Sequence, residues 1–340
     1  MNLLNKRILG EKFPTFIIHI YYFFISCTFC YIYAQKFMPA ADFYGQCDGG
    51  GIYAVLKGIA CKPMQFRILI PYTFKLLSIV TMLKDKILFV LIAVLLTYFI
   101  LLSFYLLLNC YFKSKAHNCW LAPIIIYPMI WNYVILNGQF FFMDFSILLI
   151  IVLGFYFIVS DQPVSMFVLC VIGIFNHPSV GYLIPAYLIY NYKKLLKPQT
   201  IIYTVLMSVV YIAAYRIMDK IYPSEGGYFI LYNLPRNLSL FGILSTHIIA
   251  RDIFFNMGGL HFFFLLYIFS GLWKRYRGPM LYINLVVFPY VLSVLFMFSI
   301  DDLRNYITII PFIVIGCLLY LSTFENSFLR PTEKLTGVSP

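Results

Sequence analysis

Charged residues are scarce in this sequence. Asp, Glu, Lys and Arg make up 11% of its 340 residues, whereas a soluble domain carries about 25%. Hydrophobic residues make up 62%, and apolar runs of about 20 residues recur along the chain, as membrane-spanning helices require. No hydrophilic segment is long enough to form a separate soluble domain. We therefore expect one all-α integral membrane domain over residues 1–324 and a polar cytoplasmic tail over residues 325–340. We expect this tail to be disordered.

The sequence also lacks the short motifs of several enzyme classes. It contains no Walker motif, no G-x-G-x-x-G, no H-E-x-x-H and no G-x-S-x-G, and it leaves no room for a nucleotide-binding domain. The eight cysteines show no metal-ligand spacing. Cys27 and Cys30 fit a helix as two small apolar residues. Cys47 and Cys61 share one loop and can form a disulfide if that loop lies outside the cytoplasm.

Basic residues outnumber acidic residues by 25 to 13, but they form short clusters between the apolar runs. The clusters are Lys6/Arg7/Lys12, Lys84/Lys86, Lys113/Lys115, Lys193/Lys194/Lys197 and Lys274/Arg275/Arg277. Such clusters are typical of loops retained on the cytoplasmic side of a membrane, so nucleic acid is not an expected partner. The basic N-terminus precedes a first uncleaved helix at about residues 16–34, and we expect both termini in the cytoplasm.

Two arrangements of about ten transmembrane helices fit the apolar runs. In the first, residues 66–83 cross the membrane and residues 164–192 form one helix, which leaves the Lys113 cluster outside. In the second, residues 66–83 lie at the surface as an interfacial helix and residues 164–192 cross twice, which leaves the Lys84 cluster outside. We favour the second because it gathers polar residues on the outer face. These are Asn137, Gln139, Asp144, Asn176 and His177, together with Asp42 and Asp48.

The first long polar break covers residues 41–71. It contains Asp42, Asp48, three consecutive glycines and, within an apolar segment, Arg67. A carboxylate just above a membrane suits a general base or a ligand for a divalent cation such as Mg or Mn, but each aspartate alone is as typical of a solvated loop. Tyr53 offers a hydroxyl group or an aromatic ring on which a sugar can stack. Arg67 offers a planar fork for phosphate, or else extends from an interfacial helix to the lipid headgroups.

Three polar residues interrupt later apolar runs. Asp144 stands near the start of one run, and we expect it to face protein or a cavity because exposure to lipid is costly. Asn176 and His177 precede Pro178 within another run. That pattern fits a kinked helix whose freed carbonyl groups are capped, and it fits a binding site equally well.

Two further segments carry charged residues on the same expected face. Asp302 and Arg304 lie in the short connection before the last apolar run. They either cap the two helix ends or clamp a pyrophosphate. In the polar segment 218–256, His247 and Arg251 are spaced to share one helix face.

These polar motifs occur in a defined order along the chain. They are Asp48-Gly49 with Tyr53, the segment M-Q-F-R-I-L-I-P that contains Gln65 and Arg67, then Asp144, N-H-P-S from Asn176, and R-N-Y from Arg304. This order resembles that of bacterial polytopic membrane glycosyltransferases of the GT-C kind. The sequence departs from their N-R-E-T-like turn, because His177 and Pro178 stand where Arg and Glu are expected.

The resemblance implies a GT-C-like helical bundle in the bacterial inner membrane. Such an enzyme transfers a sugar from a polyprenyl-(pyro)phosphate donor to a lipid-linked or glycan acceptor, on the outer face, during O-antigen or capsule synthesis. Asp48, with Asp42 as the alternate, would deprotonate the acceptor. The substrate- and phosphate-binding residues would be Arg67, Arg304, Tyr53, Gln65, Asp144, Asn176, His177, Asp302 and Arg251. Membrane lipids are further expected partners.

Three alternatives remain open at this stage. Repeat-unit polymerases of the Wzy type share this composition and the lipid-linked substrate, and they carry arginines in a large late loop, of which segment 218–256 with Arg236 and Arg251 is a modest version. A flippase or other transporter would need inverted repeats, which are not evident here. An acyltransferase would present a central histidine, for which His247 and His261 are candidates.

Overall fold

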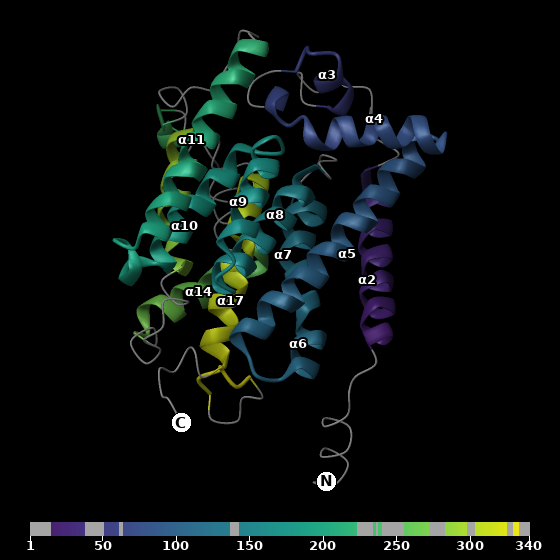
Figure 1. Cartoon of the computed structure of the whole chain (residues 1–340). Coiled ribbons are helices and arrows are strands. Elements are labelled where there is room, and N and C mark those ends of the chain that lie inside the picture. The colour runs from purple at the N-terminus through teal and green to yellow at the C-terminus, as the bar shows by residue number, and fades with distance from the viewer. Residues whose placement is uncertain are drawn as a thin grey trace.

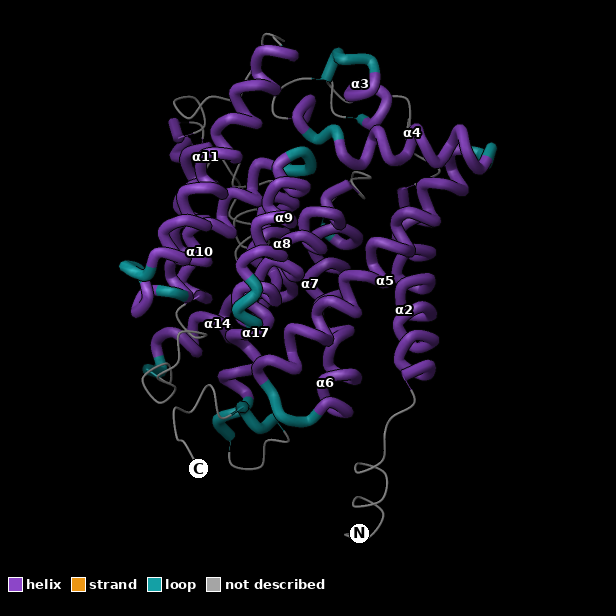
Figure 2. Tube along the Cα trace, viewed as in Figure 1, coloured by secondary structure: helices purple, strands orange, loops and turns teal. Residues whose placement is uncertain are grey.

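The computed structural model describes ten segments of the chain. They are residues 15–37, 51–60, 64–136, 143–222, 234–235, 237–239, 255–271, 283–297, 303–324 and 329–332. These segments are mostly helical, with short turns between the helices, and residues 329–332 are extended without helix (Figure 2). No β-strand occurs within them, and Phe112 and Pro331 form an isolated antiparallel bridge. The all-α prediction is therefore confirmed for this part of the chain.

The helices follow one another closely, and several pairs join end to end with a change of helix type. In chain order they are α2 (Thr15–Phe37), α3 (Ile52–Leu56), η1 (Met64–Phe66), α4 (Leu69–Thr81), α5 (Asp85–Tyr111), α6 (Lys115–Leu121), η2 (Ala122–Ile125), α7 (Ile126–Met129), η3 (Ile130–Ile135), α8 (Met143–Val159), α9 (Pro163–Ile174), η4 (Pro178–Tyr182), α10 (Leu183–Tyr190), η5 (Tyr192–Lys194), α11 (Pro198–Ile221), η6 (Asn256–Gly259), α14 (Leu260–Phe269), η8 (Ile283–Val286), α16 (Val287–Met297), η9 (Leu303–Ile309) and α17 (Ile310–Leu321).

Four helical stretches within the described segments are long and apolar enough to cross a membrane. They are Phe16–Lys36, Asp85–Tyr111, Lys115–Ile135 and Pro198–Ile221. Shorter apolar helices, α8 and α17 among them, pack between these four (Figure 1). This length and composition are consistent with a membrane protein, as the sequence predicts.

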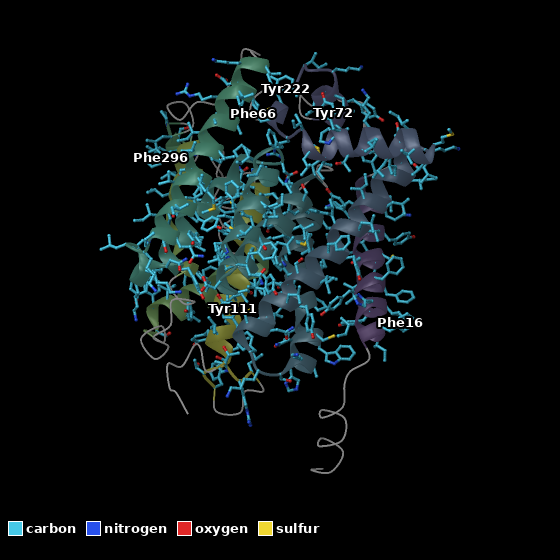
Figure 3. The ribbon with its side chains drawn as sticks, in the orientation of Figure 1. Phe16, Phe66, Tyr72, Tyr111, Tyr222 and Phe296 are labelled. Carbon is cyan, nitrogen blue, oxygen red and sulfur yellow. The ribbon has the colours of Figure 1, made fainter. Side chains whose placement is uncertain are left out.

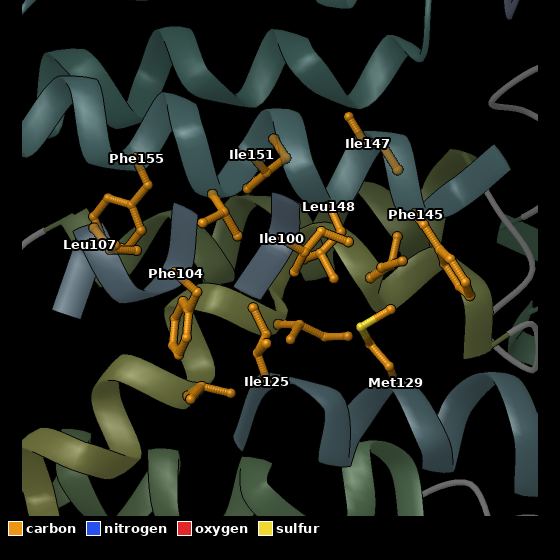
Figure 4. Packing of buried hydrophobic residues seen from close by; sticks show 14 of the residues in the cluster. Ile100, Phe104, Leu107, Ile125, Met129, Phe145, Ile147, Leu148, Ile151 and Phe155 are labelled. Carbon is orange, nitrogen blue, oxygen red and sulfur yellow. The ribbon is translucent and has the colours of Figure 1, made fainter. Parts of the chain in front are cut away.

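The packed core runs along the contact between α5 and α8. Figure 4 shows Phe104 and Leu107 of α5 and Ile151 of α8 directed toward Ile125 and Met129 from the α6–η3 stretch. All five side chains are completely buried. Lipid tails are as apolar as these side chains, so close packing rather than exclusion from water holds such a core together within a bilayer.

The segment between α8 and α11 runs up and back rather than forming one long helix. The backbone N–H of Leu69 donates to the carbonyl of Phe175, which places the end of α9 beside the start of α4. The Tyr190 hydroxyl donates to the carbonyl of Val159, which places the end of α10 beside the end of α8. The turn at residues 175–178 therefore lies at the α4 end of the bundle. This path is the one expected from the second of the two predicted arrangements, in which residues 164–192 run across and back.

Helix α4 lies across one end of the bundle instead of running along it (Figure 1). Its 13 residues span about 20 Å, which is less than the roughly 30 Å hydrocarbon core of a bilayer. One face is buried through Ile70, Pro71 and Phe74, and the Phe74 ring stacks on Phe89 of α5 with centroids 4.5 Å apart. The geometry is that of the interfacial helix predicted for this region.

Residues 329–332 bind to the opposite end of the bundle, where α5 ends. The N–H of Thr332 donates to the Tyr111 carbonyl at 2.8 Å, and the N–H of Lys113 donates to the Arg330 carbonyl at 2.9 Å. The Thr332 hydroxyl donates to the Cys110 carbonyl. The last carbonyls of a helix lack partners within it, and here the C-terminal segment supplies them. The prediction of a disordered end beyond residue 324 is therefore wrong for residues 329–332.

Ending the chain after Phe328 instead of after Thr332 is expected to lower the free energy of unfolding by about 2 to 3 kcal/mol. The shorter chain loses three hydrogen bonds of about 1 kcal/mol each and the buried side chain of Leu329, partly offset by the entropy of the released segment. Thermal unfolding in detergent measures the difference. Both chains lack residues 333–340, so the comparison isolates residues 329–332, and equal midpoints would contradict this docking.

Candidate functional site

A cluster of polar side chains is buried under α4, where several distant segments meet. Arg67 lies between η1 and α4, Asp144 lies in the first turn of α8, and Asn176 and His177 lie between α9 and η4. Arg67 is 8% exposed, Asp144 4% and Asn176 3%. We call these four residues the Arg67 cluster. Phe66 and Tyr72, which flank it in sequence, lie at the opposite end of the molecule from Phe16 (Figure 3).

Asp144 neutralises the guanidinium of Arg67. Oδ1 of Asp144 is 2.7 Å from Nη1 of Arg67, and its Oδ2 accepts a hydrogen bond of 3.1 Å from the Tyr133 hydroxyl. Burying a single charge in an apolar bundle is very costly, so a buried arginine and a buried aspartate are each stable here only because of the other. Asp144 faces protein, as its position in an apolar run requires.

The ring of His177 joins its own turn to Arg67. Its Nδ1 accepts the backbone N–H of Ser179 at 3.0 Å, and its Nε2 lies 2.7 Å from Nη2 of Arg67, within hydrogen-bond distance. His177 therefore helps to fix the position of the guanidinium.

Two buried donors of the cluster lack an acceptor among the described residues. They are Nε of Arg67 and Nδ2 of Asn176. The amide oxygen of Asn176 is already occupied by the Ser146 hydroxyl at 2.7 Å. A buried donor without an acceptor costs about 1 to 3 kcal/mol. The cluster thus holds more donors than acceptors, and both nitrogens are shielded from solvent, so an acceptor that reaches them enters an enclosed site.

Neighbouring helices hold α4 and Arg67 in place. The ring of Phe66 packs edge-on against Tyr215 of α11 with centroids 4.9 Å apart. Tyr222, just beyond the end of α11, interacts through its hydroxyl with Tyr72 of α4, and burial together with this hydrogen bond raises the pKa of Tyr222. Figure 3 shows Tyr72 and Tyr222 at the same end of the molecule.

Gln65 and Tyr53, both predicted to bind substrate, make structural contacts. Gln65 donates through Nε2 to the Val55 carbonyl and accepts the N–H of Ala60 through Oε1, each at 3.0 Å. Tyr53 donates to the carboxylate of Asp85 at the start of α5. The two side chains therefore fasten the short helix α3 to its surroundings, and none of the described hydrogen bonds joins either of them to the Arg67 cluster.

The backbone of Arg304 lies on an element next to the His177 turn. Arg304 belongs to η9, and the carbonyl of the following residue, Asn305, accepts the Tyr290 hydroxyl. The Tyr290 ring packs against Tyr182 of η4 with centroids 4.6 Å apart. Helix η4 begins directly after His177. The structure thus brings the R-N-Y motif and the N-H-P-S motif to one region, although the side chain of Arg304 is not described.

The remaining predicted residues lie outside the described segments. They are Asp42, Asp48, Asp302 and Arg251, together with Asn137, Gln139, Arg236 and His247 from the wider sets. Their proposed roles stay predictions. The described segments contain no group of three or more His, Cys, Asp or Glu side chains that would hold a metal ion.

Two contacts of the Arg67 cluster were not predicted from the sequence. The hydroxyls of Tyr133 and Ser146 bond Asp144 and Asn176, whereas Ser179 of the N-H-P-S motif bonds His177 through its backbone N–H. Tyr133 lies in η3, a π-helical turn, and such turns are frequent at functional sites. For Tyr133 and Ser146, a hydroxyl within an apolar run was the only signal in the sequence, and it is shared by many structural residues.

No protein-family model, curated protein or solved structure matches this chain. The arrangement of the cluster is therefore the main guide to its chemistry. It can hold an anionic oxygen through the nitrogens of Arg67, Asn176 and His177, with Asp144 fixing the guanidinium. The carboxylate of the cluster, Asp144, is paired with Arg67 and with the Tyr133 hydroxyl.

Proposed function

We propose that this protein is a membrane-embedded glycosyltransferase of about ten transmembrane segments. It acts on the extracytoplasmic face and transfers a sugar from a polyprenyl-(pyro)phosphate donor to a lipid-linked or glycan acceptor in surface-polysaccharide synthesis. The donor surplus of the Arg67 cluster carries this proposal. Nε of Arg67 and Nδ2 of Asn176 are buried N–H donors with no acceptor among the described residues, and a guanidinium beside such a donor suits a phosphate better than a neutral ligand.

The distribution of basic residues supports an orientation in which the Arg67 cluster faces the outside of the cell. The Lys113 and Lys193 clusters flank the ends of α5 and α10 that lie away from α4, and α2 begins on that side (Figure 1). Lysine and arginine are retained in the cytoplasm. The Arg67 cluster then faces the opposite side of the membrane, where lipid-linked sugars are used.

The roles divide between two parts of residues 41–71. Arg67, with Asn176 and His177, holds the phosphate of the donor and stabilises its negative charge as the bond to the sugar breaks. Asp48, with Asp42 as the alternate, removes the proton from the acceptor hydroxyl. Both aspartates lie between the end of α2 and the start of α3 in sequence, and those two helix ends lie at the α4 end of the molecule (Figure 1).

Asp48→Asn and Arg67→Lys are each expected to reduce polysaccharide formation about 100-fold. The first removes the base, worth at least that factor in related chemistry, and the second keeps the charge that Asp144 needs but removes the guanidinium fork. Complementation of a polysaccharide-negative strain, followed by transfer assays on purified protein with a polyprenyl-linked sugar, measures the loss.

Asp161→Asn is the matched control. Asp161 is an exposed aspartate at the other end of the bundle, so its replacement should leave transfer unchanged. Full activity in both Asp48→Asn and Arg67→Lys would overturn the site assignment. Movement of a lipid-linked saccharide across liposomes without sugar transfer would instead favour a flippase.

A further inference from the structure

Helices α4 and α5 meet at a corner that projects sideways from the bundle (Figure 1). Helix α4 ends at Thr81, and the next residue, Met82, has a left-handed backbone conformation with φ 53°. Helix α5 begins at Asp85, directly after its cap residue Lys84, which is extended. We call residues 79–87 the α4–α5 corner. It lies at the same end of the molecule as the Arg67 cluster.

The corner exposes large apolar side chains. Met82 is 89% exposed and Val80 is 70% exposed, and Ile79 and Ile87 are exposed beside them. Contiguous exposed apolar side chains of this size mark a surface that contacts lipid or a partner. A helix lying across the bundle end with such a face fits the boundary between headgroups and acyl chains.

The corner is also positively charged. Lys84 and Lys86 are both exposed, and Asp85 between them accepts a hydrogen bond from Tyr53. These lysines flank Asp85, the acidic residue in the first turn of the 27-residue α5, so the two cations outnumber the anion there. In the proposed orientation they also lie outside the cytoplasm, against the usual distribution of lysine. A net positive charge at this position favours a negatively charged headgroup.

The length of α5 allows these lysines to reach the depth of lipid phosphates. Its 27 residues extend about 40 Å, whereas the hydrocarbon core of a bilayer is about 30 Å thick. Helix α5 is therefore long enough for its first turn, with Lys84 and Lys86, to lie among the headgroups while the rest of the helix crosses the hydrocarbon.

We infer that the α4–α5 corner binds an anionic phospholipid. Its phosphate contacts Lys84 and Lys86, and its acyl chains pack on Ile79, Val80 and Met82. The same lipid holds the far end of α4 in place. The near end of α4 begins two residues after Arg67 and is bonded to Phe175, next to the Arg67 cluster, so lipid at the corner steadies the helix that follows Arg67. The inference rests on the proposed orientation but not on sugar transfer.

The test compares lipid binding by purified full-length variants. The wild-type chain, Lys84→Gln/Lys86→Gln and the control Lys193→Gln/Lys194→Gln are placed in nanodiscs of phosphatidylcholine with or without phosphatidylglycerol. Native mass spectrometry counts retained phosphatidylglycerol. Affinity should fall about fivefold for each corner lysine, about 25-fold for the pair. The control pair is equally exposed but lies at the opposite end, and it should bind as the wild type does.

Hydrogen exchange over residues 64–81 tests the link to α4. Phosphatidylglycerol should slow exchange in the wild type and in the control, and it should have no effect in Lys84→Gln/Lys86→Gln. Equal binding by all three variants, or equal losses in both double variants, would overturn the inference. So would displacement of the lipid by millimolar inorganic phosphate, since that would indicate a site for free phosphate. None of these measurements involves sugar transfer, so an inactive enzyme would refute the proposed function and leave this result intact.

Discussion

Replacing Asp144 with alanine is expected to lower the free energy of unfolding by about 3 to 5 kcal/mol. The substitution leaves the guanidinium of Arg67 buried without its counter-ion at 2.7 Å, and removing one partner of a buried ion pair typically costs that much. It also removes the acceptor of the Tyr133 hydroxyl. Unfolding in mixed micelles with increasing SDS measures the change.

The double variant Arg67→Met/Asp144→Leu is expected to recover most of that stability. Apolar residues of similar volume remove both desolvation penalties at once, and such replacements of buried pairs are often neutral or stabilising. Asp161→Asn serves as the control, because its partner Lys194 is 3.6 Å away, both side chains are largely exposed, and asparagine tolerates the left-handed backbone of residue 161. That pair should contribute less than about 1 kcal/mol. A double variant as unstable as Asp144→Ala would contradict this account.

This pair of variants also separates stability from activity. If the Arg67 cluster exists to bind a phosphate, Arg67→Met/Asp144→Leu will fold and remain inactive. If the cluster only joins α4 to α8, the double variant will fold and retain activity. The second result would leave the fold intact as described and would remove the main support for the proposed function.

Replacing Gly258 with alanine is expected to cost about 3 to 4 kcal/mol. Gly258 has φ +63°, a conformation that costs an alanine about 1 to 2 kcal/mol. A Cβ there would also overlap the rings of Tyr127 and Trp131, and forcing atoms into filled space costs about 1 to 3 kcal/mol. The Trp131 ring is stacked on Phe255, which restricts its escape. The same SDS titration measures the effect.

Gly58 provides the matched control for this glycine. It has φ +72°, but a Cβ added there meets no atom within 4 Å. Gly58→Ala should therefore show the conformational cost alone, about 1 to 2 kcal/mol. The difference between the losses in free energy of unfolding for Gly258→Ala and Gly58→Ala is the cost of overlap between a Cβ at position 258 and the rings of Tyr127 and Trp131. Equal effects would show that backbone conformation alone explains the glycine at position 258.

The sequence predicted the polar cluster better than it predicted the partners within the cluster. Arg67, Asp144 and His177 are each candidates because a charged or polar group inside an apolar run is energetically costly and is usually functional. That argument does not depend on packing, and the structure brings all three together across as many as 110 residues. Which nitrogen of His177 faces Arg67 depends on the backbone of Ser179, and no sequence pattern specifies it.

Other outcomes depended on packing that composition does not reveal. Gln65 and Tyr53 matched a motif, yet their hydrogen bonds fasten α3 to nearby segments. The polar composition after residue 324 predicted disorder, but the carbonyl groups at the end of α5 need donors, and Thr332 provides them. The short helix α9 could not be distinguished from half of a kinked helix by length alone. Its separate path became clear only from its contact with α4.

The docking of residues 329–332 determines when the fold can be completed. The hydroxyl of Thr332 bonds a carbonyl 222 residues earlier in the chain, so this contact forms only after nearly all of the helices have been synthesised. Until then the end of α5 keeps unpaired carbonyl groups. A chain interrupted anywhere before residue 329 carries that defect permanently, and cellular proteases remove destabilised chains preferentially. The hydrogen bonds at the last turn of α5 thus make a chain that reaches Thr332 more stable than a shorter one.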